Sequence, residues 1–148
     1  MRHRVLPIAP LAALILACAT DAPRLRVAVE GSTFQRAPGA SPGTWVAASI
    51  PFTITNIGEK SAFVPACGGR PLPQIQQFVA GHWELYAGGY CLANVSMVPR
   101  ELRVEESYSG TAAIDQPGRF RLYFGYADGP AIADSRRYDA LSAPFDVR

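Results

Sequence analysis

The sequence predicts an all-β domain, folded as an antiparallel β-sandwich of about seven to eight strands. From Leu25 onward, no window sustains the three- and four-residue apolar spacing of an amphipathic helix. Apolar and polar residues instead alternate, and Gly, Pro and Asn interrupt the alternation at short intervals. Seven or eight short strands in about 120 residues are the number and spacing expected of a β-sandwich.

The clearest expected strand covers residues 45–56. Ala48, Ile50, Phe52 and Ile54 fall on one of its faces, because successive side chains of a strand alternate between faces. Pro51 has no N–H to donate to a neighbouring strand, so we expect this strand to be bulged or to lie partly at an edge.

The next expected feature is a hairpin of residues 74–79 and 82–87 around the turn at 80–81. We expect the hairpin to bury Trp83 and Leu85 and to expose Glu84 and Tyr86. The other expected strands lie near residues 25–29, 62–64, 102–104, 108–114, 120–124 and 141–147. The stretches 37–43 and 127–138 are predicted loops.

The amino terminus predicts export. Three residues, Arg2 to Arg4, precede the apolar run 5–17, which is the pattern of a signal peptide and is too short for a permanent membrane span. The run ends in Ile15-Leu16-Ala17-Cys18, which resembles the lipobox of bacterial lipoproteins. We therefore expect residues 1–17 to be a lipoprotein signal peptide, 18–24 a lipidated tether and 25–148 the domain. The alternative is a soluble secreted protein, cut near Ala17 or Ala19.

The resemblance implies a protein of the bacterial cell envelope, held to the membrane by lipid on Cys18. Two or three buried acyl chains suffice for such an anchor, because each CH₂ group contributes about 0.8 kcal/mol. Ala19, rather than Asp, after the cysteine resembles sorting signals that direct lipoproteins to the outer membrane, where the protein would face the periplasm.

The three cysteines support the same interpretation. An exported chain with an odd number of cysteines needs a role for the unpaired one, and lipidation gives that role to Cys18. Cys67 and Cys91 then form an even pair, for which a disulfide is the expected state outside the cytoplasm. The alternative is a redox pair or a reactive thiol, but the sequence has no Cys-x-x-Cys spacing and no predicted helix that would lower a thiol pKa.

The charge and the motifs predict no enzyme, metal, cofactor or nucleic-acid partner. Removal of 1–17 takes two of the 14 basic residues and leaves 12 against 12 acidic residues, without a basic run. Residues 39–43 match the Gly-x-Ser-x-Gly pattern of hydrolases, but they lack the strand before and the helix after that this motif needs. His82 alone cannot build a copper or zinc site. Asp128, Asp134 and Asp139 lack the spacing of a calcium loop.

Several segments together resemble the immunoglobulin-like domains of small bacterial envelope lipoproteins. They are Thr55-Asn56-Ile57-Gly58, Pro65-Ala66-Cys67-Gly68, His82-Trp83-Glu84-Leu85, Cys91, and Pro117-Gly118-Arg119-Phe120-Arg121-Leu122. The resemblance covers roughly residues 45–147 and implies an immunoglobulin-like sandwich. Within the wider sandwich class, some members resemble proteinase inhibitors and others act as adhesion or assembly modules.

The sequence also offers a candidate binding face. Tyr86, Arg121 and Tyr123 fall on the expected outward side of their strands, and Tyr and Arg are enriched at binding hot spots. The alternative is that they are ordinary cross-strand pairs. We therefore expect a non-catalytic, lipid-anchored binding or structural module, whose partner is an envelope protein or a protease. The alternative function is a proteinase inhibitor that acts through an exposed loop, either 37–43 or 127–138.

Overall fold

A computed structural model of the chain describes residues 21–39, 41, 43–89 and 91–148. No helix occurs among them, and hence none with the length and apolar character to cross a membrane. The strands are β1 (Leu25–Val29), β2 (Thr33–Phe34), β3 (Ala37–Pro38), β4 (Trp45–Val46), β5 (Ala48–Asn56), β6 (Ala62–Val64), β7 (Ala66–Cys67), β8 (Arg70–Pro71), β9 (Gln74–Val79), β10 (His82–Gly88), β11 (Arg100–Leu102), β12 (Ser107–Ile114), β13 (Gly118–Ala127), β14 (Arg137–Leu141) and β15 (Phe145–Val147).

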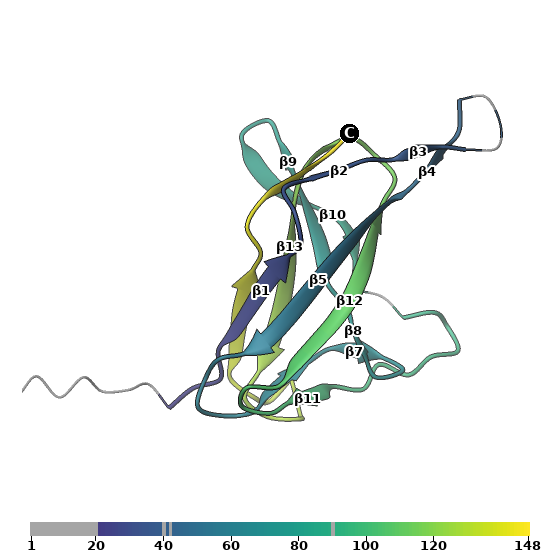
Figure 1. The fold of residues 1–148 in the computed structure, drawn as a ribbon. Helices are drawn as coiled ribbons and strands as arrows, with labels where there is room; N and C mark the ends of the chain where they lie inside the picture. Colours follow the sequence, from purple (N-terminus) through teal and green to yellow (C-terminus); the bar gives the residue numbers. More distant parts are fainter. Residues whose placement is uncertain (1–20, 40, 42, 90) are drawn as a thin grey trace, which may run out of the picture.

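The strands form the predicted all-β sandwich (Figure 1). The small sheet has the antiparallel order β1-β5-β12. The large sheet has the order β10-β9-β13-β15-β2, with β14 paired to β13 and with β6 between β13 and β11. Two short hairpins, β3–β4 and β7–β8, lie outside these sheets.

The core lies between β5 of the small sheet and β13 of the large sheet. Alternate residues of β5 are buried as predicted, and they face the buried side chains of Phe120, Leu122 and Phe124 from β13. The rings of Phe52 and Phe124 meet across the two sheets with centroids 5.5 Å apart. Burial of each such side chain contributes about 1.5–3 kcal/mol. The core residues all lie between positions 25 and 147, so the chain from Ala19 onward contains them.

Pro51 lies where one side of β5 has no partner strand, as predicted. The last residue pair between β1 and β5 is Val29 with Phe52. The carbonyl of Pro51 accepts the N–H of Glu30 at 3.3 Å, just beyond the end of β1. Because the nitrogen and the carbonyl of one strand residue point to the same side, the proline nitrogen also faces this gap and leaves no donor unpaired.

The β9–β10 hairpin forms and Glu84 is exposed, both as predicted, but Trp83, Leu85 and Tyr86 do not lie on the predicted sides. Leu85 is 58% exposed and Trp83 is only half-buried, on the side of the large sheet that faces solvent. The register moves from Leu85 opposite Gln76 to Ala87 opposite Ile75, which leaves Tyr86 as an extra residue in a bulge. Alternation along a strand does not tell which face is inward, so the sequence pattern alone could not fix this orientation.

The C-terminal strand expected at residues 141–147 is two strands. Residues 137–141 form β14, which includes the end of the predicted loop 127–138, and β15 follows after Pro144. Between them, Ser142 exchanges two hydrogen bonds of 2.9 Å with the backbone of Leu122: its hydroxyl accepts the N–H and its N–H donates to the carbonyl. These two bonds hold the segment between β14 and β15 against β13.

Candidate functional site

An exposed cluster of aromatic, apolar and polar side chains lies on the outer face of the large sheet, over β10, β9 and β13. We call it the Arg–Trp patch. It consists of Gln76, Phe78, Trp83, Leu85 and Arg121. The rings of Phe78 and Trp83 pack at 5.1 Å between centroids, and Phe78 is 43% exposed. Among the residues that the structure describes, no second layer of the sandwich covers this face, so the patch is open to a partner.

Two contacts hold Arg121 in place within the Arg–Trp patch. Its guanidinium carbon lies 4.3 Å from the centroid of the Trp83 ring, a cation–π contact. Its Nε donates a 2.7 Å hydrogen bond to Oε1 of Gln76. Among the described residues, Arg121 forms no ion pair. A guanidinium that is oriented but has no carboxylate partner presents its terminal nitrogens to an incoming acceptor.

Tyr123 continues the same face two residues along β13 from Arg121. Its hydroxyl donates a hydrogen bond to the carboxylate of Asp139 in β14. This hydrogen bond, with some burial, raises the pKa of Tyr123 above its ordinary value. Tyr123 borders a hollow of about 280 Å³, which is also lined by Leu72, Gln74, Met97, Ile132, Arg137 and Asp139. The hollow extends the Arg–Trp patch toward β14 and adds one positive and one negative side chain, Arg137 and Asp139.

Tyr86 does not share this face, which corrects the predicted grouping of Tyr86, Arg121 and Tyr123. Strand β9 lies between β10 and β13. The Tyr86 ring packs edge-on against the buried Phe120 ring, with centroids 5.2 Å apart, and its hydroxyl donates to the carboxylate of Asp115. Burial first, and then the Asp115 carboxylate, raise the pKa of Tyr86. Because Leu85 faces solvent, alternation places the next residue, Tyr86, on the core side of β10.

The sequence prediction missed Trp83, Phe78 and Gln76 as surface residues. The turn does determine which residues face each other across the hairpin. Ala80 and Gly81 both have positive φ, 49° and 92°, as in the two-residue turns that are common in β-hairpins. Such a turn places Phe78 directly opposite Trp83, so both rings must lie on one face. Which face it is depends on β13, which is distant in the sequence.

The predicted disulfide is present between Cys67 of β7 and Cys91, with Cα atoms 5.5 Å apart and a sequence separation of 24. It joins the β7–β8 hairpin to the segment that precedes β11. Exposed apolar side chains follow on this segment, including Leu92, Met97 and Val98. Cys18, the predicted lipid attachment site, lies in residues 1–20, outside the described residues.

No group of three or more His, Cys, Asp or Glu side chains that could hold a metal ion occurs among the described residues. The Nε2 of His82 lies 2.6 Å from Oε1 of Glu84, in an exposed pair on β10. Asp128 accepts the N–H of Arg136 at 3.0 Å, and Asp139 accepts the Tyr123 hydroxyl. Of the hydrolase-like pattern 39–43, residues 40 and 42 lie outside the description.

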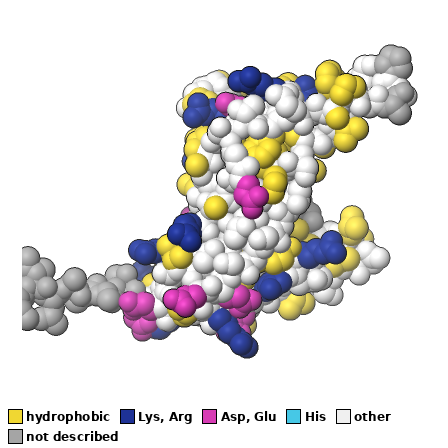
Figure 2. Space-filling model, viewed as in Figure 1, with side chains coloured by type: hydrophobic (Ala, Val, Ile, Leu, Met, Phe, Trp, Pro, Cys, Tyr) yellow, Lys and Arg dark blue, Asp and Glu magenta, His cyan; other side chains and the backbone are white. Residues whose placement is uncertain are grey.

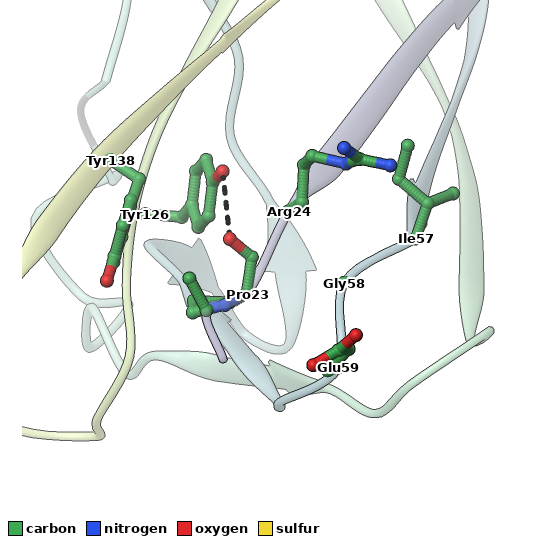
Figure 3. Close-up of a pocket in the computed structure, with 8 residues that line it drawn as sticks. Pro23, Arg24, Ile57, Gly58, Glu59, Tyr126 and Tyr138 are labelled. Atoms are coloured by element: carbon green, nitrogen blue, oxygen red, sulfur yellow. Dashed lines mark hydrogen bonds between the residues drawn. The ribbon is translucent and has the colours of Figure 1, made fainter. Parts of the chain in front are cut away.

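A second hollow, of about 390 Å³, lies where the N-terminal segment meets the sandwich (Figure 3). Figure 3 shows Pro23 and Arg24 between Tyr126 and the turn at 57–59. The Tyr126 hydroxyl lies 3.5 Å from the Pro23 carbonyl, and the N–H of Ile57 donates to the Arg24 carbonyl at 2.7 Å. Much of the wall of this hollow is backbone paired with backbone, and these hydrogen bonds attach residues 22–24 to the sandwich.

Comparisons with known proteins identify no family. No family model matches the chain, and no curated protein matches it. A solved structure described as "X-ray structure of Northeast Structural Genomics Consortium target SoR45" is similar, with a TM-score of 0.48 and 19% identity over 83% of this chain and 85% of that chain.

Proposed function

We propose that the protein is a non-catalytic binding module of the bacterial cell envelope, with an immunoglobulin-like sandwich anchored to the membrane by lipid on Cys18. The lipobox-like sequence 15–18 and the signal-like run before it support export and anchoring. The Cys67–Cys91 disulfide is compatible with an oxidising compartment.

The Arg–Trp patch is the proposed binding surface. The observation that carries this proposal is the placement of Arg121, stacked on Trp83 and hydrogen-bonded to Gln76 beside the exposed Phe78 and Leu85. Trp and Arg are the residue types most enriched at binding hot spots, and an ordered side chain loses less entropy on binding. The partner class that suits this chemistry is a protein surface with a carboxylate next to apolar side chains.

The test is crosslinking in the native envelope, followed by enrichment of the tagged protein and mass spectrometry. Three variants are compared with the wild type: Arg121→Glu, Trp83→Ala and the control Arg70→Glu, which reverses an exposed charge on β8 away from the Arg–Trp patch. We expect a stoichiometric partner with the wild type and with Arg70→Glu, and its loss with both patch variants. A partner retained at full yield by both patch variants would contradict the proposed surface.

Proteinase inhibition is the second candidate, because the β3–β4 hairpin projects from the sandwich (Figure 1). Ala37 and Pro38 pair with Val46 and Trp45, and the N–H of Gly39 donates to the Thr44 carbonyl at 2.8 Å. A loop that projects from a paired hairpin stem is a form in which an inhibitor presents residues to a protease. Stoichiometric inhibition of a secreted protease, abolished when 39–43 is replaced by a two-residue turn, would favour this candidate over the first.

A further inference from the structure

Strand β12 forms an open edge of the small sheet. It pairs along all eight of its residues with β5, and it is the last strand of the order β1-β5-β12. In Figure 1 the β3–β4 hairpin lies near one end of β12, and β7, β8 and the segment before β11 lie near the other end, where β8 contacts β12. Backbone N–H and C=O groups on that side of β12 have no strand partner among the described residues.

The other sheet edges carry features that prevent strand pairing. Strand β10 has the bulge at Tyr86 and the charged Glu84. Strand β1 has the charged Arg26 as its second residue and contacts β14. Strand β11 has only three residues, two of them charged, and β2 has two residues. Bulges, charges and short length are the devices by which proteins keep edges from pairing.

Strand β12 contacts β8, and Arg100 stacks on Tyr108 near its start, but the strand itself has no bulge, no charged residue and no shortened length. Residues 107–114 contain no charged residue and no proline, and the register with β5 runs without a shift. Figure 2 shows acidic side chains gathered instead at the end of the molecule from which the N-terminal segment leaves. An edge that is long, regular and uncharged is a template for another strand.

We propose that the occupant of this edge is β12 of a second copy, paired antiparallel across a two-fold axis at Gly110. The two small sheets then join into one six-stranded sheet. A second copy suits this edge because identical neutral strands bring no like charges together, and because closed two-fold pairing is the commonest symmetry of homo-oligomers. This proposal does not depend on the function of the Arg–Trp patch.

The side chains along β12 suit that register. In this register the numbers of two paired residues sum to 220, and the side chains of a pair lie on the same face. Tyr108 would therefore lie opposite Ala112 of the second copy, a large residue against a small one. Ser109 would lie opposite Thr111 of the second copy, where two hydroxyl groups meet. At Gly110, a Cβ would lie 2.7 Å from the Phe52 ring and 2.9 Å from the Tyr108 ring, so glycine leaves room for both rings beside the centre of the strand.

The test is sedimentation equilibrium of the chain from Ala19 onward, over a range from low to high micromolar concentration. Thr111→Lys adds an exposed charge at the edge, and in the proposed register two lysines from the two copies lie about 7–8 Å apart. Ser49→Lys is the matched control, because Ser49 is exposed on the same face of the small sheet but on the central strand β5. We expect a dimer for the wild type and the control, with the dissociation constant raised about tenfold or more by Thr111→Lys.

Amide hydrogen exchange supplies a second readout. Dimerisation through β12 should slow exchange in residues 107–114 as the protein concentration rises, and should leave residues 82–88 of β10 unaffected. A protein that stays monomeric at every concentration would overturn the proposal. A dimer that Thr111→Lys does not weaken would overturn it as well, and loss of that dimer with Arg121→Glu would assign the contact to the Arg–Trp patch instead.

Discussion

The side-chain amide of Asn56 donates a 2.9 Å hydrogen bond to the backbone carbonyl of Leu102. Asn56 ends β5 of the small sheet and Leu102 ends β11 of the large sheet, so this bond joins the two sheets within the interior. The same amide donates to the Lys60 carbonyl at 2.7 Å, and its oxygen accepts the N–H of Gly58 at 3.0 Å. Asn56 is fully buried, and the three bonds leave little of its hydrogen-bonding capacity unused.

Asn56→Ala should lower the free energy of unfolding by roughly 2–4 kcal/mol, because it leaves two carbonyl groups and one N–H without their side-chain partner. The measurement is urea unfolding monitored by tryptophan fluorescence. Asn94→Ala is the control, since Asn94 is exposed and should change stability by less than about 0.5 kcal/mol. Equal midpoints for the two variants would mean that water replaces the lost contacts.

Gly58→Ala should destabilise the attachment of the N-terminal segment. A Cβ at Gly58 would lie against the backbone nitrogen of Arg24 and 2.6 Å from the carbonyl oxygen of Ala22, so the backbone itself must move. We expect a loss of roughly 1–3 kcal/mol, typical of overpacking. Gly125→Ala is the control, because its Cβ would meet the nearest atom, the Tyr123 hydroxyl, at an ordinary 3.6 Å. Thermal unfolding of both variants measures the difference, and identical transitions would contradict the close approach.

Removal of the disulfide should lower stability by roughly 3 kcal/mol in the chain-entropy model, given the 24-residue separation of Cys67 and Cys91. The double variant Cys67→Ser/Cys91→Ser is compared with the wild type by urea unfolding, with and without reductant. Reductant should bring the wild type to the stability of the variant and leave the variant unchanged. A wild type that reductant does not affect, and that shows two reactive thiols when unfolded, would contradict the disulfide.

The sequence pattern correctly predicted the strands in which the alternating apolar residues are the ones buried in the core. In β5 and β13, Ile50, Phe52, Leu122 and Phe124 lie on the predicted inner faces, because both strands run through the centre of the sandwich. The sequence pattern placed Asn56 at the end of the expected strand 45–56, but its link to Leu102 joins positions 46 apart and leaves no local signal.

The candidate site was less predictable because it depends on how strands at the margin are oriented. Arg121 was identified from its position in β13, yet its partners Trp83 and Gln76 come from β10 and β9. Trp83 and Leu85 face solvent, which by alternation places Tyr86 on the core side, and nothing in the local sequence signals this orientation. Where a strand is not flanked on both faces by core, hydrophobic residues alone do not indicate which side faces inward.

Three tyrosines should make the protein lose stability in alkaline solution. Burial raises the pKa of Tyr126, and burial together with Asp115 raises that of Tyr86. The hydrogen bond to Asp139 is the main cause for Tyr123. Since the ordinary tyrosine pKa is 10.0, the unfolded chain ionises first as pH rises. The stabilisation is therefore complete below about pH 10 and is lost progressively as pH rises toward the higher pKa values of the folded state.

Asp139→Asn should separate these contributions, because it removes the carboxylate that accepts the Tyr123 hydroxyl and leaves the Tyr86–Asp115 contact intact. Residue-resolved NMR titration of the tyrosine rings should then show the pKa of Tyr123 falling toward its ordinary value while that of Tyr86 is unchanged. Asp115→Asn is the reciprocal control and should lower the pKa of Tyr86 alone. Urea unfolding of Asp139→Asn across about pH 9–12 should show a shallower loss of stability than the wild type, since one raised tyrosine pKa has been removed. Parallel stability profiles, with Tyr123 titrating as in the wild type, would show that Asp139 does not control the Tyr123 hydroxyl.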